Sequence, residues 1–143
     1  MRPAPPASLF HLALHVRDLD GARDFYGRVL GCREGRSTAT WVDFDFFGHQ
    51  LSCHLGEPFA TAYTGYVGGV PVPMPHLGAV LPLAAWERVR DRLAAEPTTD
   101  YVFEPMLRYP GAPGEQWVLF VRDPSGNPIE LKGFADMSGV YAT

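Results

Sequence analysis

The stretch FHLALHVRDLDGARDFYGRVLG, from Phe10 to Gly31, contains the change of period that decides the fold. Its first seven residues alternate between apolar and other side chains, which predicts a strand over Phe10–Val16. From Leu19 onward the apolar residues recur at steps of three and four, which predicts an amphipathic helix. Asp18 is suited to cap the start of that helix, and Gly31 stands where a glycine commonly ends one.

Two more strands are expected in the first half of the chain, Trp41–Phe47 and Gln50–Leu55, joined by a tight turn at residues 48–49. The next segment, residues 56–75, contains a Gly-Gly pair at 68–69 and prolines at 71, 73 and 75. We therefore expect this segment to be a linker without regular structure.

The second half repeats the same order of elements. A strand is expected at His76–Leu81, followed by a helix over Leu83–Ala95. Three further strands are expected at Tyr101–Phe103, Trp117–Arg122 and Pro128–Lys132. The sequence Asp-Pro-Ser-Gly-Asn at residues 123–127 predicts the turn between the last two.

The two halves look like copies of one unit. Each opens with His-Leu, at residues 11–12 and again 65 residues later at 76–77, in a chain of 143 residues. A duplicated βαβββ unit of the α+β class is the simplest account, because one unit alone is too small to bury much core. We expect a single domain over 1–143, with module one at about 9–56, a linker at about 57–74 and module two at about 75–134.

Composition restricts the class of function. Hydrophobic residues make up 46% and charged residues 20%, the balance of an ordinary globular domain. The net charge of −4 argues against a nucleic acid partner, and no apolar run approaches the roughly 20 residues of a membrane span. Residues 1–8 lack the apolar core of a signal peptide, and Cys32 and Cys53 are too few for a secreted disulfide framework. We therefore expect a cytoplasmic protein.

Strand parity gathers polar side chains on one face. Residues two apart in a strand share a face, and the helix of each unit should cover the apolar one. One consistent assignment places six polar residues on the opposite face: His11, His15, His54, His76, Glu130 and Lys132. Imidazoles together with a carboxylate are what a divalent metal site requires.

Geometry reduces this set. His11 and His15 lie four residues apart, about 13 Å along a strand, so both cannot bind one ion. His49 falls at the turn with the opposite parity to His54. Four candidate ligands remain, one from each of four strands: His11, His54, His76 and Glu130. We expect them to hold one divalent metal ion per chain.

The quoted opening stretch and the closing stretch RDPSGNPIEL, Arg122 to Leu131, resemble the start and end of a vicinal oxygen chelate module. This superfamily includes glyoxalase I, extradiol dioxygenases and bleomycin-resistance proteins, and the resemblance covers roughly residues 9–134. It implies two βαβββ modules whose strands form a curved, barrel-like mixed sheet around a metal ion, with the helices outside. It also implies a homodimer, which exposed sheet edges favour as well.

The resemblance assigns roles to individual residues. His11, His76 and Glu130 match the two-histidine, one-carboxylate set of extradiol dioxygenases, which leaves coordination positions open. His54 falls where glyoxalase I often has a glutamate that also transfers protons, so isomerase activity on methylglyoxal–glutathione is in doubt. The ion could be Fe, Zn, Ni or Mn.

Two classes of function follow. The first is a metal-dependent enzyme for a small molecule that offers two neighbouring oxygens, with dioxygenase-like chemistry favoured over glyoxalase-type isomerase or lyase chemistry. The second is a non-catalytic ligand-binding protein of the bleomycin-resistance type. His15 is either an acid–base residue or a hydrogen-bonded spacer, and Lys132 either pairs with a substrate anion or forms a salt bridge.

Overall fold

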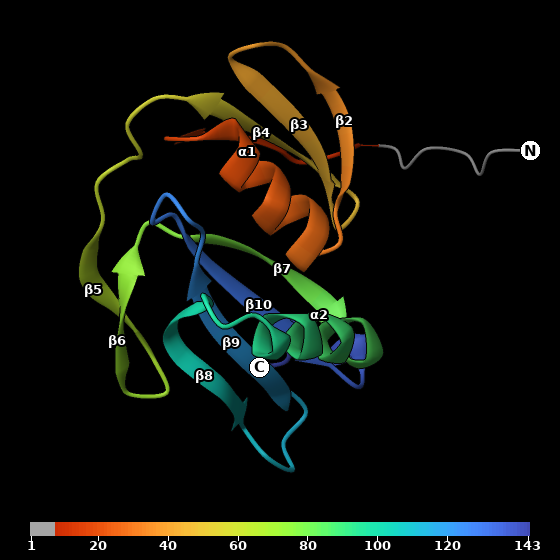
Figure 1. The fold of residues 1–143 in the computed structure, drawn as a ribbon. Coiled ribbons are helices and arrows are strands. Elements are labelled where there is room, and N and C mark those ends of the chain that lie inside the picture. The colour runs from red at the N-terminus through yellow and green to blue at the C-terminus, as the bar shows by residue number, and fades with distance from the viewer. Residues whose placement is uncertain (1–7) are drawn as a thin grey trace, which may run out of the picture.

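The computed structural model describes residues 8–143 and contains two βαβββ modules joined by a β-hairpin (Figure 1). Module one consists of β1 (His11–Val16), α1 (Leu19–Ala22) continued by the π-helix η1 (Arg23–Val29), β2 (Arg33–Ser37), β3 (Trp41–Phe46) and β4 (His49–Leu55). Module two consists of β7 (Leu77–Pro82), α2 (Leu83–Ala95), β8 (Asp100–Arg108), β9 (Gln116–Arg122) and β10 (Pro128–Phe134), followed by the 3₁₀ helix η2 (Met137–Tyr141).

Each module folds its four strands into one mixed sheet. The strand orders are β1-β4-β3-β2 and β7-β10-β9-β8, and in each sheet the first and last strands of the module pair in parallel. The remaining neighbours are antiparallel. The α+β fold class predicted from the sequence is thereby confirmed. Within residues 8–143 the two sheets remain separate, so one chain does not close a barrel.

The first helix forms where the period of the sequence changes. The carboxylate of Asp18 accepts hydrogen bonds from the amides of Asp20 and Gly21 at 3.2 and 3.0 Å, which caps the helix as expected. The five apolar residues predicted for the covered face are all buried: Leu19, Ala22, Tyr26, Val29 and Leu30; Phe25 is buried as well. Gly31 ends the helix with φ 78°, a conformation that glycine adopts without strain.

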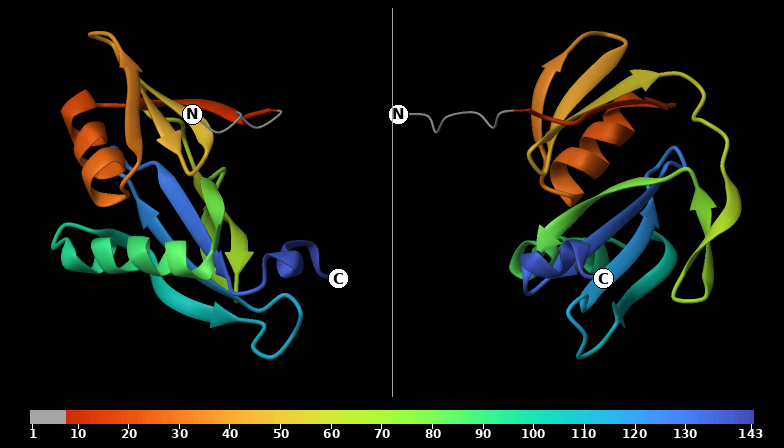
Figure 2. Two further views of the ribbon diagram at one scale, coloured as in Figure 1. Left: turned by 90° about the vertical axis from the view of Figure 1, so that its right-hand side faces the viewer. Right: turned by 180° about the vertical axis from the view of Figure 1, so that it is seen from behind.

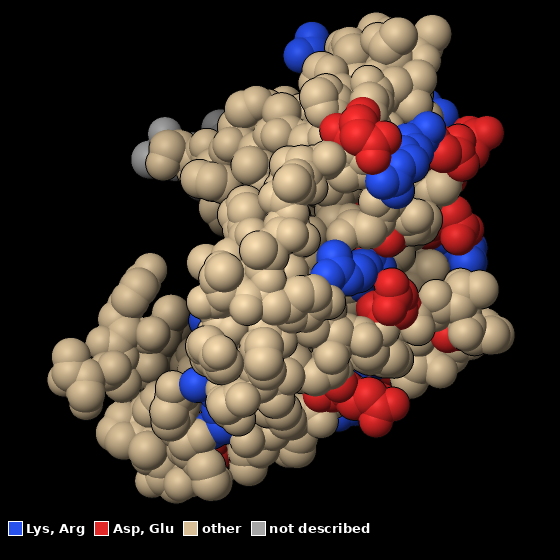
Figure 3. All heavy atoms as spheres, turned by 90° about the vertical axis from the view of Figure 1, so that its left-hand side faces the viewer, with Lys and Arg blue, Asp and Glu red and all other residues tan. Residues whose placement is uncertain are grey.

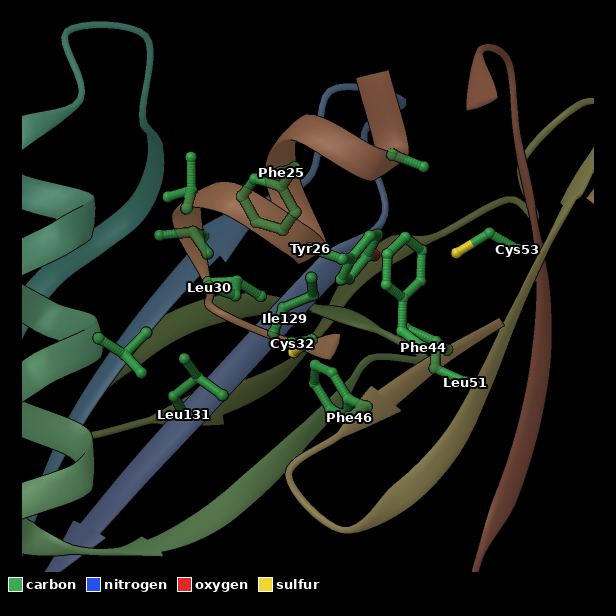
Figure 4. Packing of buried hydrophobic residues seen from close by; sticks show 14 of the residues in the cluster. Phe25, Tyr26, Leu30, Cys32, Phe44, Phe46, Leu51, Cys53, Ile129 and Leu131 are labelled. Carbon is green, nitrogen blue, oxygen red and sulfur yellow. The ribbon is translucent and has the colours of Figure 1, made fainter. Parts of the chain in front are cut away.

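A single hydrophobic core joins the two modules. It combines the helix-covered faces of both sheets with the apolar faces of both helices. Figure 2 (left) shows that the two helices lie on the same side of the molecule. Figure 4 shows Tyr26 and Phe44 of module one in the same cluster as Ile129 and Leu131 of module two. Because this core takes the apolar face of each sheet, the polar faces point away from it.

The predicted turn at residues 123–127 ties module two to module one. The buried carboxylate of Asp123 accepts a hydrogen bond from the Tyr26 hydroxyl at 2.8 Å and from two backbone amides of its own turn. The side-chain amide of Asn127 donates to the backbone carbonyl of His15 at 2.9 Å. The turn therefore fixes the end of β1 relative to β10.

The expectation of an unstructured linker at residues 56–75 is wrong. This segment contains a hairpin of β5 (Ala62–Val67) and β6 (Val70–Met74), which pair with each other as a separate two-stranded sheet. Gly68 and Gly69 adopt φ 56° and 80°, the positive values that a two-residue hairpin turn needs. The prolines are accommodated because each strand of a two-stranded ribbon has an unpaired edge.

One strand, β2, was not expected from the sequence, and another, β8, is longer than expected. β2 consists entirely of exposed residues, so it has no apolar alternation from which to predict it. β8 runs to Arg108 rather than ending at Phe103, and its pairing with β9 shifts register twice along this length. Such irregularities interrupt the period on which the sequence prediction depends.

Candidate functional site

The strand parity inferred from the sequence holds in the structure. Among the residues expected to face the helices, seven are buried: Leu14, Val16, Leu51, Cys53, Leu81, Ile129 and Leu131. Leu12, Leu77 and Ala79 are partly buried and pack against the core, whereas Leu55, at the end of β4, is 42% exposed. The polar candidates lie on the opposite faces, and they divide between the two modules. His11, His15 and His54 belong to the first sheet, whereas Glu130 and Lys132 belong to the second and His76 immediately precedes its strand β7.

His76 and Glu130 form the best-defined pair of candidate residues. The Nε2 atom of His76 lies 3.9 Å from Oε1 of Glu130. The Nδ1 atom of His76 lies 2.8 Å from the carbonyl oxygen of Pro73, which can only accept, so Nδ1 is the donor. The neutral ring therefore presents the lone pair of Nε2 on the side of Glu130. Phe120 packs edge-on against the imidazole, with ring centroids 4.8 Å apart.

Glu130 has a buried carboxylate, and one of its two oxygens has no hydrogen-bond partner among the described residues. Its residue is only 7% exposed, and Oε1 lies 3.6 Å from Nζ of Lys132. The Oε2 atom is buried and has no hydrogen-bond partner among the described residues. Buried carboxylate oxygens are normally paired, so this unpaired oxygen is suited to contact a bound ion or ligand.

A hollow of about 460 Å³ opens over this pair. Its polar lining consists of His49, His76, Glu130 and Lys132, and Phe10 and Phe47 add apolar surface from module one. Strand parity excluded His49 from the predicted ligands, but this residue begins β4 next to the turn and lines the same hollow as residues of module two. The sequence feature that could have indicated His49 as a residue of this hollow is its position beside a tight turn, because strand parity points the other way.

The register of β1 against β4 separates His54 from His11. The two strands run parallel, with His11 opposite Gln50 and His15 opposite His54. His54 is therefore four strand positions from His11, about 13 Å, which is too far for both to bind one ion. The expectation that His54 joins His11 at a shared ion is corrected by this register.

The internal duplication identifies the residue that corresponds to Glu130. Glu130 pairs with Gly78, and the residue 65 positions before Gly78 is Ala13, which pairs with Ser52. Ser52 thus takes the place of Glu130 in module one. Its hydroxyl donates to the carboxylate of Asp43 at 2.6 Å, and both residues are buried. By the same correspondence His54 matches Lys132, a residue beside the carboxylate and not the carboxylate itself.

His15 and His54 share a second, separate hollow. Their Cα atoms are partners in the register, and both line this hollow together with Glu57 and Phe59. The His54 ring lies near Trp41, with ring centroids 6.2 Å apart. Glu57 is held by Arg17 at 2.7 Å. These two histidines therefore occupy a different part of the molecule from the His76–Glu130 pair.

One chain does not bring the four expected ligands together. Within residues 8–143, no three side chains of His, Cys, Asp or Glu lie close enough to hold one metal ion. The structure gathers His76, Glu130 and Lys132, and it leaves His11 exposed on the face of the other sheet. The hollow over His76 and Glu130 therefore does not include His11.

Comparison with solved structures identifies similar proteins. A glyoxalase/bleomycin resistance protein/dioxygenase from Alicyclobacillus acidocaldarius is 32% identical, with 99% of this chain and 100% of that chain covered and a TM-score of 0.72. The fosfomycin resistance protein FosX from Mesorhizobium loti is 17% identical over 94% of this chain and 98% of that chain, with a TM-score of 0.65. A lactoylglutathione lyase from Agrobacterium tumefaciens is 20% identical over 98% and 100%, with a TM-score of 0.62. The last two likenesses concern the fold alone.

Other comparisons and the surface add further information. No family model and no curated protein matches the sequence. None of the helices in residues 8–143 is long and apolar enough to cross a membrane. On the face drawn in Figure 3, basic and acidic side chains are interspersed, and no continuous basic area is seen there. This surface agrees with the net charge of −4.

Proposed function

Because this chain belongs to the glyoxalase/bleomycin resistance protein/dioxygenase family of the vicinal oxygen chelate superfamily, we propose that it is a metal-dependent enzyme acting on a small molecule. One observation carries the proposal: within residues 8–143 the buried Glu130 carboxylate has an oxygen without a hydrogen-bond partner, and its other oxygen lies 3.9 Å from Nε2 of His76. The substrate would offer two neighbouring oxygens, as the superfamily name implies.

The residues present fit a divalent metal ion. His76 is oriented as a nitrogen ligand, because a neutral ring that donates from Nδ1 to the carbonyl of Pro73 has its lone pair on Nε2. Glu130 supplies a carboxylate oxygen with no other partner among the described residues. One imidazole and one carboxylate are hard or borderline ligands of the kind that Fe, Zn, Ni and Mn accept.

His11 is proposed as the third ligand, supplied by a second copy of the chain. It is exposed on the polar face of its sheet, and the hollow over His76 and Glu130 does not include it. β1 and β7 are both edge strands, and unpaired edges favour association with another chain. A homodimer would then contain two equivalent sites, each with His11 from one chain and His76 and Glu130 from the other.

When bound, the metal supplies a Lewis acid that polarises the two substrate oxygens. Lys132 keeps an ammonium group 3.6 Å from Glu130, where it offsets the carboxylate charge and offers a donor to a negatively charged substrate atom. His15 lies about 13 Å along β1 from His11, so it would transfer protons only with a distant part of the substrate.

The donor set favours dioxygenase-like chemistry over isomerase or lyase chemistry. Two histidines and one carboxylate leave coordination positions open for substrate and a co-substrate such as O₂. An isomerase needs a proton-transferring base, yet Ser52 stands where module two has its carboxylate. Elemental analysis of protein purified without chelators distinguishes the alternatives, since iron supports dioxygenase chemistry and nickel or zinc supports isomerase or lyase chemistry.

Metal titration of ligand variants tests the proposal. We expect one ion per chain in the natural protein and a loss of affinity of at least about tenfold in His76→Ala and in Glu130→Ala. His54→Ala is the matched control, because it removes an imidazole from the other hollow, and it should retain the natural affinity. Binding no tighter than millimolar in the natural protein would contradict the enzyme proposal and favour a non-catalytic ligand-binding protein.

A further inference from the structure

Two imidazoles with opposite proton positions line the hollow over Glu130. His76 comes from the start of module two, and His49 comes from the first residue of β4 in module one. Each ring has one nitrogen engaged by a backbone group, but the two backbone groups differ in kind. In the neutral rings, the free nitrogen is therefore a hydrogen-bond donor in His49 and an acceptor in His76.

In His49 the free ring nitrogen, Nε2, is a hydrogen-bond donor. The backbone amide of Phe10 donates to its Nδ1 atom at 3.0 Å, so this nitrogen is an acceptor and the neutral ring carries its proton on Nε2. The Phe10 and His49 rings also contact edge-on, with centroids 6.5 Å apart. The free nitrogen of His49 thus presents an N–H group, which cannot bind a metal ion in that form.

In His76 the free ring nitrogen, Nε2, is a hydrogen-bond acceptor. Its Nδ1 donates to the carbonyl of Pro73 at 2.8 Å, which leaves a lone pair on Nε2 near Glu130. The same hollow therefore contains an acceptor pair, His76 and Glu130, suited to a cation. It also contains two donors, the Nε2 hydrogen of His49 and the ammonium of Lys132, suited to an anion.

We propose that His49 is a substrate-contacting residue that donates its Nε2 hydrogen to an oxygen anion of the ligand. The ligand class is a small oxyanion with two neighbouring oxygens, bound between the His76–Glu130 side and the donors His49 and Lys132. This inference rests on the proposed function for the position of the ligand. The proton placement on His49, however, depends only on the Phe10 amide and is testable without any metal.

Nitrogen-detected NMR of the natural protein labelled with ¹⁵N tests the proton positions. We expect the spectrum of neutral His49 to show the proton on Nε2 and that of His76 to show it on Nδ1. Zn²⁺ should then move the Nε2 resonance of His76 and leave the nitrogens of His49 in place. A proton on Nδ1 of His49, or direct zinc coordination by His49, would overturn the proposal.

Oxalate is the probe for the donor role, because it is a small dianion with neighbouring oxygens. We expect oxalate to bind the zinc-loaded protein and to move the Nε2–H signal of His49, and His49→Ala to weaken oxalate binding about tenfold. His49→Gln, which keeps a side-chain donor, should recover part of that loss. His54→Ala, the control from the other hollow, should bind oxalate like the natural protein.

The two proposals fail in different ways. If zinc does not bind the natural protein, the proposed function fails, and oxalate titration of the metal-free protein still decides the role of His49. If zinc binds but His49→Ala retains the natural oxalate affinity, the metal site stands and the donor role of His49 is refuted. The donor role of His49 is also refuted if oxalate leaves the His49 signals unchanged in both the zinc-loaded and the metal-free protein.

Discussion

Asp123 shows how one buried residue can connect two modules. Its carboxylate accepts hydrogen bonds from the Tyr26 hydroxyl, from the backbone amides of Ser125 and Asn127, and from the Asn127 side chain. The first of these bonds crosses from module two to module one, and the others shape the turn. A buried charge is tolerated only when it is paired in this way.

Removing the Tyr26 hydroxyl should destabilise the protein. Tyr26→Phe eliminates a 2.8 Å bond to a buried carboxylate, and hydrogen bonds to charged groups contribute about 1.5–3 kcal/mol. We expect a loss of this size in the free energy of unfolding, measured by urea denaturation. Tyr66→Phe is the matched control, because Tyr66 is 72% exposed, and it should change stability by less than about 0.5 kcal/mol. Equal effects of the two variants would contradict the role of the buried bond.

The two buried thiols should make stability fall in alkaline solution. Burial raises the pKa of Cys32 and of Cys53 to about 12, from an ordinary value of 9.0. Between these values the unfolded chain loses thiol protons that the native state keeps, so the free energy of unfolding falls as pH rises. The slope is at most about 1.4 kcal/mol per pH unit for each thiol.

The double variant Cys32→Ala, Cys53→Ala checks this pH dependence. It should show a shallower decrease of unfolding free energy between pH 9 and pH 12 than the natural protein. The remaining slope includes Tyr26, because burial raises the pKa of its phenol well above 10.0 and so acts in the same direction. An unchanged slope in the double variant would show that the thiols titrate alike in both states.

The β5–β6 hairpin is an element that packs through one face only. Val67 and Val72 are buried against Val118 and Phe120 of β9, whereas Tyr66 points to solvent. Val72→Ala should therefore lower the free energy of unfolding by about 1–3 kcal/mol, measured by thermal or urea denaturation. Tyr66→Ala on the same hairpin is the control and should have little effect. A neutral Val72→Ala would mean that the hairpin does not dock on the sheet.

The pairing of β7 with β10 depends on a glycine. A Cβ atom on Gly78 would lie 1.7 Å from the carbonyl oxygen of Glu130, a distance that forces the strands apart. Gly78→Ala should cost about 1–3 kcal/mol of stability and weaken metal binding, because Glu130 belongs to the displaced backbone. Gly114→Ala is the control, since its Cβ meets nothing closer than 4.0 Å. If Gly78→Ala keeps the metal affinity of the natural protein, Glu130 is not a ligand of the metal.

At the scale of the whole molecule, the two polar faces belong to different sheets, and the core between them cannot open without unfolding. The proposed site therefore predicts a homodimer, with sedimentation at twice the mass of one chain at micromolar concentration. A species of single-chain mass would contradict it. The arrangement also predicts complementation between two inactive chains.

Mixed dimers test whether the ligands come from two chains. In a dimer of His11→Ala with Glu130→Ala, one site has lost both ligands and the other has lost neither. Refolding the two variants together should therefore restore, in part of the dimers, the natural metal affinity that neither variant has alone, measured by calorimetry. No recovery in the mixture, with dimers demonstrably present, would place His11 and Glu130 in different sites.

The sequence by itself determined the local elements and the faces of the strands. The change of period after Val16 marked the first strand and helix, and alternation along each strand placed His11, His76 and Glu130 on polar faces. These features are local, because side chains in a strand alternate whatever their partner is. The 65-residue repeat likewise required only comparison of the two halves.

Only the tertiary structure decided which residues on those faces meet. Alternation fixes a face but not the register, and the hydrogen bonds between β1 and β4 placed His54 beside His15 instead of His11. The approach of the β3–β4 turn to module two, which brings His49 to the hollow over Glu130, depends on packing between residues far apart in the chain. Such contacts follow from the shared core and carry no periodic signal in the sequence.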